Sequence, residues 1–395
     1  MSPATEPRST RAAQLLAAAK DLAPLFEANA KQAELERRLP PEVAEALKAA
    51  ELFWMKSPES LGGAELAPLE FADVIEEIAY HDASAAWATV IGNGTTGVVS
   101  GWLPDEGVEE MWSGDEKPIV AGQFTPSGVA KPVPGGYRVS GRWGFGSGID
   151  HANWVVGAAI VEGSAPPEII FFTVPKADVT VVDNWYVAGL QGTGSKGYTV
   201  EDVLVPSGRT MGAYGAVARR GGPLYREPIT VFISNEISPL VVGVARRALD
   251  DIVDQAERTA RSLTGVGDLI DRVPFHKTLG QSWAKWHAAR SLYREAARES
   301  FAIVEAGGEI SDDLVADLWA RHTFVAELCD ELVRDVFRYG GGRVLSLDHP
   351  LQRHVRNLIG ALQHIHLSDE KFEFAGQALI RGRTGRTLGG KAIDG

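Results

Sequence analysis

The spacing of apolar residues changes twice along the chain, and each change predicts a change of secondary structure. Between residues 10 and 113 apolar positions recur every three or four residues, as in "TRAAQLLAAAKDLAPLF" and "APLEFADVIEEIAYHD", which predicts amphipathic helices. From about 117 to 211 the period falls to two in runs such as "GGYRVSGRW" and "EIIFFTVP", which predicts strands. From about 229 to 380 the helical spacing returns in four runs of roughly 20–30 residues. The last of them is "PLQRHVRNLIGALQHIHLSDEKFEFAGQAL".

This order predicts three units. We expect an N-terminal helical domain over residues 1–115, a small β-barrel domain over 116–215 and a C-terminal four-helix bundle over 216–395. A chain of 395 residues exceeds the size at which one core keeps growing, so a division into domains is expected.

Composition narrows the class of protein. No apolar run approaches the ~20 residues of a membrane span, and the first residues lack the apolar segment of a signal peptide, so we expect a cytoplasmic protein without a membrane partner. The net charge of −13 argues against nucleic-acid binding. The single cysteine, Cys329, excludes an intrachain disulfide and a thiolate metal cluster, and we expect a buried thiol.

Two apparent motifs do not carry the chemistry they suggest. "GTGSKG", residues 192–197, spells the dinucleotide fingerprint, but a strand-like "YTVEDVLVP" follows it where that fingerprint requires a helix. His364 and His366 stand two apart on a predicted helix, which would point them to different faces rather than toward one metal ion. We therefore expect neither a Rossmann fold nor a metal site.

Three longer strings, in order, resemble the acyl-CoA dehydrogenase superfamily. They are "LGGAELAPLEFADVIEEIAYHDASAAWA", "WYVAGLQGTGSKGYTVEDVLVP" and "RYGGGRVLSLDHPLQRHVRN", and the resemblance extends over nearly the whole chain. It implies the acyl-CoA dehydrogenase-like fold, with a flavin between the β-domain and the bundle. It also implies a homotetramer in which a neighbouring subunit helps to hold the cofactor.

Two further strings favour oxygenation over dehydrogenation. "LQHIHLSDEKFEF" lacks the Y-E-G-T type of stretch that supplies the base in many dehydrogenases, and "SGRWGFGSGIDHANW" resembles the corresponding stretch of reduced-flavin monooxygenases. The resemblance implies the oxygenase component of a two-component monooxygenase. Such a protein takes FMNH2 or FADH2 from a separate NAD(P)H:flavin reductase, and its co-substrate is O2. Through a C4a-hydroperoxyflavin it would hydroxylate an aromatic, polycyclic or heteroatom-containing small molecule.

The same matches imply the site residues. Ser147 would place a hydroxyl beside flavin N5, and His364 would place an imidazole beside the peroxide. His151, after the same turn, is expected to be structural. The candidate cofactor-binding residues are Gln123, Phe124, Thr125, Trp143, Phe145, Ser147, Arg272 and Phe275.

The substrate remains open at this point. Relatives that hydroxylate phenols carry a histidine near the position of Thr95, so Thr95 and Asn93 are the candidate substrate-binding residues. The alternatives are an acyl-CoA dehydrogenase with bound FAD, an amine N-oxygenase of the same fold, and a catalytically silent scaffold protein. The sequence does not choose between FMN and FAD.

Overall fold

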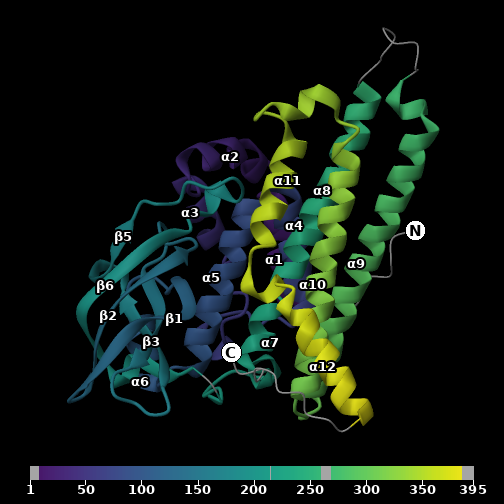
Figure 1. The fold of residues 1–395 in the computed structure, drawn as a ribbon. Helices are drawn as coiled ribbons and strands as arrows, with labels where there is room; N and C mark the ends of the chain where they lie inside the picture. Colours follow the sequence, from purple (N-terminus) through teal and green to yellow (C-terminus); the bar gives the residue numbers. More distant parts are fainter. Residues whose placement is uncertain (1–8, 214, 259–267, 385–395) are drawn as a thin grey trace.

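A computed structural model describes residues 9–213, 215–258 and 268–384. Its helices and strands follow the predicted order of helices, sheet and helical bundle (Figure 1). The helices before the sheet are α1 (Thr10–Asp21), α2 (Ala23–Glu36), α3 (Pro41–Ala49), α4 (Pro68–His81), α5 (Ala83–Trp102) and α6 (Asp105–Trp112). Those after it are α7 (Ile229–Ser234), α8 (Ile237–Arg258), α9 (Val273–Glu305), α10 (Asp312–Phe337), α11 (Pro350–Ala361) and α12 (Glu370–Thr384).

The strands form one seven-stranded sheet in the order β5-β6-β2-β1-β3-β4-β7. They are β1 (Val120–Val133), β2 (Gly136–Gly146), β3 (Trp154–Val161), β4 (Ile169–Pro175), β5 (Thr180–Val182), β6 (Lys196–Pro206) and β7 (Thr210–Gly212). β5 and β7 stand at opposite ends of this order, so the ladder does not close into the expected barrel. Both strands are only three residues long, too short to pair along a full barrel seam.

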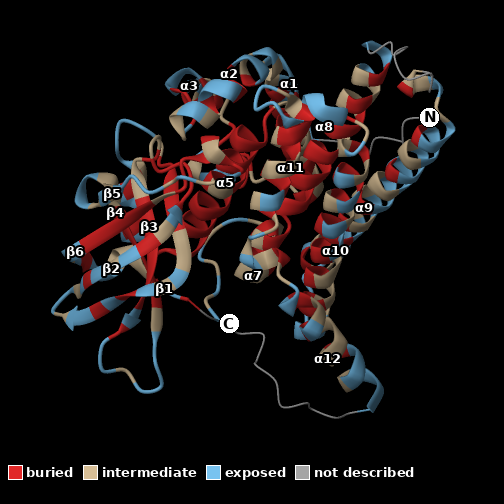
Figure 2. Cartoon of the chain, turned by 45° about the horizontal axis from the view of Figure 1, so that its top comes forward, coloured by how far each residue is buried: buried red, intermediate tan, exposed pale blue. Residues whose placement is uncertain are grey.

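Helix α5 lies between the sheet and the bundle (Figure 1). Asp82 caps it by accepting a hydrogen bond from the backbone N–H of Ser84 at 2.8 Å. Almost every residue of α5 is buried, because the helix contacts β1 on one side and α4, α7 and α8 on others. Buried residues gather where α5 meets the sheet and along the inside of the bundle (Figure 2). A helix buried on all sides is expected to carry few charged residues, and α5 carries none.

The stretch Ile229–Arg258 is long and apolar enough to cross a membrane by length and composition, which refines the sequence-based expectation that no run would be. Within the fold, 78% of its most apolar window is buried, since α8 packs against α4, α9, α10 and α11. That burial is typical of a core helix. Cys329 on α10 is also fully buried, as predicted, and burial raises the pKa of its thiol.

The fourth predicted helix is interrupted, which corrects the prediction of one continuous helix. α11 ends at Ala361, a short 3-10 turn spans Ile365–Leu367, and α12 begins at Glu370. The backbone of His364 is extended, with φ −70° and ψ 138°, so it lies in the break rather than on a helix. Apolar spacing continues through the break, which is why periodicity alone did not reveal it.

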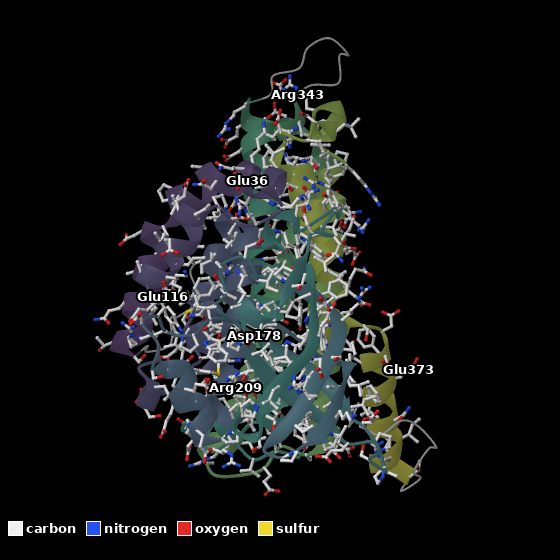
Figure 3. The ribbon with its side chains drawn as sticks, turned by 90° about the vertical axis from the view of Figure 1, so that its left-hand side faces the viewer. Glu36, Glu116, Asp178, Arg209, Arg343 and Glu373 are labelled. Atoms are coloured by element: carbon white, nitrogen blue, oxygen red, sulfur yellow. The ribbon has the colours of Figure 1, made fainter. Side chains whose placement is uncertain are left out.

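The rejected dinucleotide motif has the predicted surroundings. Residues Gln191–Thr193 form a 3-10 turn, and the chain then enters β6 rather than a helix. The charged residues Glu116, Asp178 and Glu373 are exposed on different parts of the surface (Figure 3).

Candidate functional site

Ser147 occupies a tight turn at the end of β2. Its backbone N–H donates to the carbonyl oxygen of Phe145 at 2.9 Å, and the N–H of Gly148 donates to Thr193 at 2.9 Å. The ring of His151 lies close under this turn, because a Cβ on Gly148 would come within 2.9 Å of His151 Nε2. Burial lowers the pKa of His151 to about 3, so it is a neutral residue packed against Phe53. This buried, neutral state suits the structural role that the sequence predicts for His151.

The Ser147 hydroxyl is the end of a chain of short contacts. Its Oγ lies 2.6 Å from Ser195 Oγ, which lies 2.7 Å from Thr193 Oγ1. Thr193 Oγ1 in turn donates to the carbonyl oxygen of Leu190 at 2.7 Å. All three hydroxyl residues are buried, with exposed fractions of 6%, 3% and 1% from Ser147 to Thr193. Ser195 and Thr193 belong to the string that first resembled a dinucleotide motif.

Trp87 on α5 joins Ser147 to His364. Its indole Nε1–H donates to Ser147 Oγ at 3.1 Å, and its ring meets the His364 ring edge to face at 5.6 Å between centroids. Two candidate residues more than 200 positions apart in the sequence thus lie on the same tryptophan. Trp87 itself was not predicted as a site residue, although it stands next to last in the string "LGGAELAPLEFADVIEEIAYHDASAAWA".

The break between α11 and α12 fixes the tautomer of His364. The backbone N–H of His366 donates to His364 Nδ1 at 3.3 Å, so the ring hydrogen is on Nε2. Burial, with a smaller contribution from the Lys371 ammonium, lowers the pKa of His364 to about 4. The imidazole is therefore neutral near pH 7 and offers Nε2–H as a hydrogen-bond donor. The rings of His364 and His366 lie 5.3 Å apart, which corrects the expectation that they point to different faces.

The residues around His364 are mainly aromatic. His366 and Trp319 lie 6.4 Å apart between ring centroids, and Lys371 Nζ lies 4.2 Å from the centre of the Trp319 ring. Burial lowers the pKa of His366 well below its usual value. Within the described residues no group of three or more His, Cys, Asp or Glu side chains could hold a metal ion.

The predicted flavin-facing segment of β1 lies in an irregular part of the ladder. Residues 123–125 fall between the paired positions Gly122 and Pro126, where the register with β3 shifts. On its other side β1 pairs with β2 only from Gly128 onward, so the two strands diverge beside this segment. Irregular strand segments of this kind are common beside functional sites.

Tyr198 on β6 bridges β1 and β3 beside this segment. Its hydroxyl accepts from the backbone N–H of Gln123 at 3.2 Å and donates to the carbonyl oxygen of Val156 at 2.6 Å. Next to it, Phe124 is half-buried against Phe171 at 4.6 Å between ring centroids, while Thr125 is exposed. The segment therefore has a fixed backbone and one side open to solvent.

The β2 segment presents an open surface next to Ser147. Phe145 has a left-handed backbone, with φ 57°, and its ring is 65% exposed. A Cβ added at Gly144 would meet no atom within 4 Å. A bulky residue with positive φ is an uncommon, strained conformation of the kind that clusters at functional sites. Trp185 flanks the Phe145 ring at 6.2 Å between centroids.

Trp143 lies in the core rather than on this open surface. Its ring is 3% exposed, stacks on Tyr198 at 5.5 Å and donates from Nε1 to Ala158 at 3.0 Å. Its predicted contact with a flavin stays a prediction, and this burial disfavours it.

The two candidate substrate residues have structural partners. Asn93 Nδ2 donates to the carbonyl oxygens of Leu52 and Thr89 at 2.7 and 2.8 Å, and its Oδ1 accepts from the backbone of Lys56. Thr95 Oγ1 lies 2.5 Å from the carbonyl oxygen of Val120, which ties α5 to β1. A substrate would have to displace these bonds, so they disfavour the predicted substrate contacts.

Arg272 and Phe275 are not brought together with Ser147. They lie at the N-terminal end of α9, at the upper end of the bundle, whereas the sheet lies beside its lower half (Figure 1). Phe275 is 1% exposed and packs on Tyr339 at 5.3 Å between ring centroids. For Arg272, a role in binding the flavin of a neighbouring subunit stays a prediction. For Phe275, burial within its own subunit disfavours such a role.

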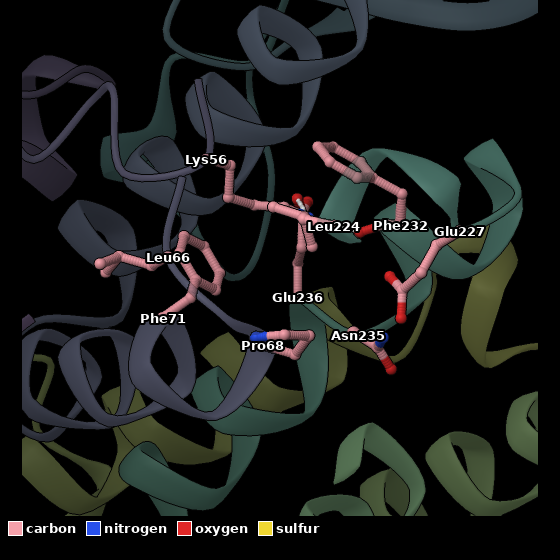
Figure 4. Close-up of a pocket in the computed structure, with 9 residues that line it drawn as sticks. All are labelled: Lys56, Leu66, Pro68, Phe71, Leu224, Glu227, Phe232, Asn235 and Glu236. Carbon is pink, nitrogen blue, oxygen red and sulfur yellow. Dashed lines mark hydrogen bonds and ion pairs between the residues drawn. The ribbon is translucent and has the colours of Figure 1, made fainter. Parts of the chain in front are cut away.

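A second buried cluster lies near Gly94, two turns further along α5 than Trp87, and is drawn in Figure 4. Lys56 Nζ forms an ion pair with Glu236 and also donates to the carbonyl oxygen of Phe232. Glu227 accepts from Ser300 Oγ at 2.8 Å, and its second carboxylate oxygen has no hydrogen-bond partner. Burial raises the pKa of both glutamates to about 7. The enclosed space between them is about 10 Å³, close to the size of one water molecule.

This cluster depends on close approach to α5. A Cβ on Gly94 would come within 2.5 Å of Glu236 Oε2, so the carboxylate occupies space that a side chain would take. Charged groups buried this deeply lose their hydration, and an opposite charge or a hydrogen bond must compensate for that loss. The cluster therefore holds the α7–α8 segment against α5, on which Trp87 also lies.

Comparison of the whole chain with known proteins identifies its family. The chain matches the family models for the acyl-CoA dehydrogenase N-terminal domain over residues 10–105 and the acyl-CoA dehydrogenase C-terminal domain over residues 236–369. A pigment production hydroxylase of a Rhodococcus species is 30% identical, over 85% of this chain and 88% of the relative.

Two further comparisons agree with these. The oxygenase component of an FADH(2)-dependent resorcinol hydroxylase from a Rhizobium species is 29% identical, over 96% of this chain and 97% of the relative. The crystal structure of 3-HSA hydroxylase from Rhodococcus sp. RHA1 superposes with a TM-score of 0.87 at 25% identity, over 95% of this chain and 98% of the other.

Proposed function

Because the chain belongs to the acyl-CoA dehydrogenase family and is an oxygenase component of a flavin-dependent monooxygenase, we propose that its reaction takes place between Ser147 and His364. The observation that carries this proposal is Trp87, which bonds Ser147 and packs against His364. The break between α11 and α12 and the turn after β2 thus supply one polar group each to the same place.

The residues present fit a flat flavin ring. The open surface at Gly144 and Phe145 offers an exposed aromatic face, and the β1 segment at residues 123–125 beside it lies outside the regular ladder. When bound, reduced flavin supplies the electrons that activate O2. The protein's part is to bind the ring, hold hydrogen bonds to it and exclude water.

His364 acts in this proposal as a neutral hydrogen-bond donor. Its Nδ1 is occupied by the backbone N–H of His366, and its pKa of about 4 leaves Nε2 with a hydrogen that it can share with bound oxygen. A proton donated from Nε2 would leave an imidazolate, so the geometry favours hydrogen bonding over acid catalysis by this residue.

The substrate, in this proposal, is an aromatic or polycyclic small molecule, and a separate flavin reductase supplies FMNH2 or FADH2. The resorcinol hydroxylase relative, named as an FADH(2)-dependent oxygenase component, supports both points. The alternative to hydroxylation at carbon is oxygenation of a heteroatom in the substrate. A homotetramer remains our expectation from the family.

The test is oxygen labelling. Purified protein, an unrelated flavin reductase, NADH and either FMN or FAD are incubated under 18O2 with a panel of phenols and indoles. We expect one product that gains a single 18O atom only when the protein is present. An FAD-loaded protein that is bleached by an acyl-CoA and yields no labelled product would instead indicate a dehydrogenase.

A further inference from the structure

The hydroxyl chain that ends at Ser147 has one arrangement of hydrogens in which every short contact is a hydrogen bond. The carbonyl oxygen of Leu190 can only accept, so Thr193 Oγ1, 2.7 Å away, gives it its single hydrogen. Ser195 Oγ, 2.7 Å from Thr193 Oγ1, must then donate to that oxygen. Ser147 Oγ, 2.6 Å from Ser195 Oγ, must in turn donate to Ser195. Each hydroxyl passes its hydrogen toward Leu190.

Trp87 occupies one of the two lone pairs of Ser147 Oγ. An indole N–H can only donate, and Trp87 Nε1 does so to Ser147 Oγ at 3.1 Å. A hydroxyl oxygen has one hydrogen and two lone pairs, so Ser147 has given its hydrogen to Ser195 and filled one lone pair with Trp87. One lone pair remains. Toward any further ligand Ser147 is an acceptor and not a donor.

We propose that Ser195 and Thr193 are positioning residues that present Ser147 as an acceptor and thereby select reduced over oxidised flavin. The inference rests on the proposed contact between Ser147 and flavin N5. Reduced flavin carries a hydrogen at N5 and donates it, whereas N5 of oxidised flavin carries a lone pair. Oxidised flavin therefore places an acceptor against an acceptor, which leaves two buried polar atoms unsatisfied.

The hydroxyl chain is anchored at Leu190, which two further hydrogen bonds hold in place. The backbone N–H of Leu190 donates to Asn357 Oδ1 on α11 at 2.8 Å, and its carbonyl oxygen also accepts from Trp185 Nε1 at 3.3 Å. The hydroxyl residues are at most 6% exposed, so bulk water has little access with which to reverse them. The preference for reduced flavin thus originates in a loop held by the bundle.

Ser195→Ala tests the proposal directly. It removes the acceptor for the Ser147 hydrogen, so the freed hydroxyl can donate to N5 of oxidised flavin. We expect the ratio of the oxidised to the reduced FMN dissociation constant to fall on the order of tenfold, mainly through tighter binding of oxidised FMN. That change lowers the two-electron potential of the bound flavin by about 30 mV. Flavin-free protein is titrated with oxidised FMN and, anaerobically, with reduced FMN.

A conservative pair separates this role from a packing role. Thr193→Val removes the oxygen that receives the Ser195 hydrogen and should lower the ratio, whereas Thr193→Ser keeps the hydroxyl and should retain it. This pair also serves if the Ser195 variant does not fold. The control is Ser207→Ala, an exposed serine whose loss should change neither dissociation constant. Equal weakening of both flavin forms in the Ser195 and Thr193→Val variants, or an unchanged ratio, would overturn the proposal.

Ser147→Ala keeps this result distinct from failure of the proposed function. Loss of preference in Ser147→Ala and Ser195→Ala supports the chain as described. An unchanged ratio in Ser147→Ala would show that Ser147 does not contact N5, which refutes the inference while labelled product in the 18O2 assay still supports the oxygenase function.

Discussion

Substitution of His364 distinguishes a neutral donor from a protonated acid. With a pKa of about 4, only about one molecule in a thousand carries an imidazolium at pH 7. The neutral ring donates through Nε2, because Nδ1 accepts from His366. Loss of one donor from a water-excluded site typically costs on the order of 10²–10³ in rate. We therefore expect His364→Ala to lower the rate of oxygen transfer by about a hundredfold.

Glutamine offers a matched variant. Its side-chain amide can place an N–H donor near the position of Nε2 but has no titration in this range, so we expect His364→Gln to stay within about tenfold of the wild type. The assay is a single turnover, with product formed per reduced flavin oxidised, from pH 6 to 9. Because the pKa of His364 is lowered, the neutral form is present throughout this window and the wild-type yield should be flat with respect to this residue.

A protonated His364 would give a different profile. The imidazolium fraction falls tenfold per pH unit above its pKa, so a yield that falls in this way from pH 6 to 9 in the wild type, but not in His364→Gln, would refute the reasoning. Equal activity of His364→Ala and the wild type would remove His364 from the site altogether.

Three other predictions concern stability. Ser147→Ala leaves Trp87 Nε1 buried without a partner and should cost about 1–3 kcal/mol of unfolding free energy in denaturant titrations, and adding Trp87→Phe should cost less than the sum of both. Lys56→Met leaves Glu236 buried without its cation and should cost about 3–5 kcal/mol, much of which Lys56→Met with Glu236→Gln recovers; no loss in the single variant would contradict the ion pair. The pKa of Glu227 is raised to about 7 from an ordinary 4.5, so the folded state holds a proton that the unfolded state releases and stability falls as pH rises between them. Glu227→Gln should reduce that slope to the part that Glu236 contributes, and thermal unfolding at pH 5 and pH 8 measures it.

Much of the fold could be predicted because periodicity records burial. The order of helices, sheet and bundle follows from the spacing of apolar residues alone. Periodicity failed between α11 and α12, where "LIGALQHIHLSDEKFEF" keeps helical spacing across a break. There the backbone N–H of His366 turns back onto His364 Nδ1, a contact that no count of apolar residues can reveal.

The candidate site was predicted only in part, because its polar partners come from distant segments. Ser147 and His364 were proposed from the resemblance, but Trp87 and Ser195 were not, since a hydrogen bond over 60 or 48 positions leaves no pattern in the sequence. Asn93 was proposed as a substrate residue with Thr95, from the position of a histidine in phenol-hydroxylating relatives. The sequence cannot show that its amide binds the backbone of Leu52.

The most direct test of the central claim is the reaction of the reduced-flavin complex with oxygen in a stopped-flow spectrophotometer. Wild-type protein with reduced FMN, mixed anaerobically and then with oxygenated buffer, should show flavin reoxidation in two phases separated by a transient absorbance, and Ser147→Ala and His364→Ala should each shorten that transient. Reoxidation in one phase at the rate of free FMN, unchanged in both variants, would contradict the account.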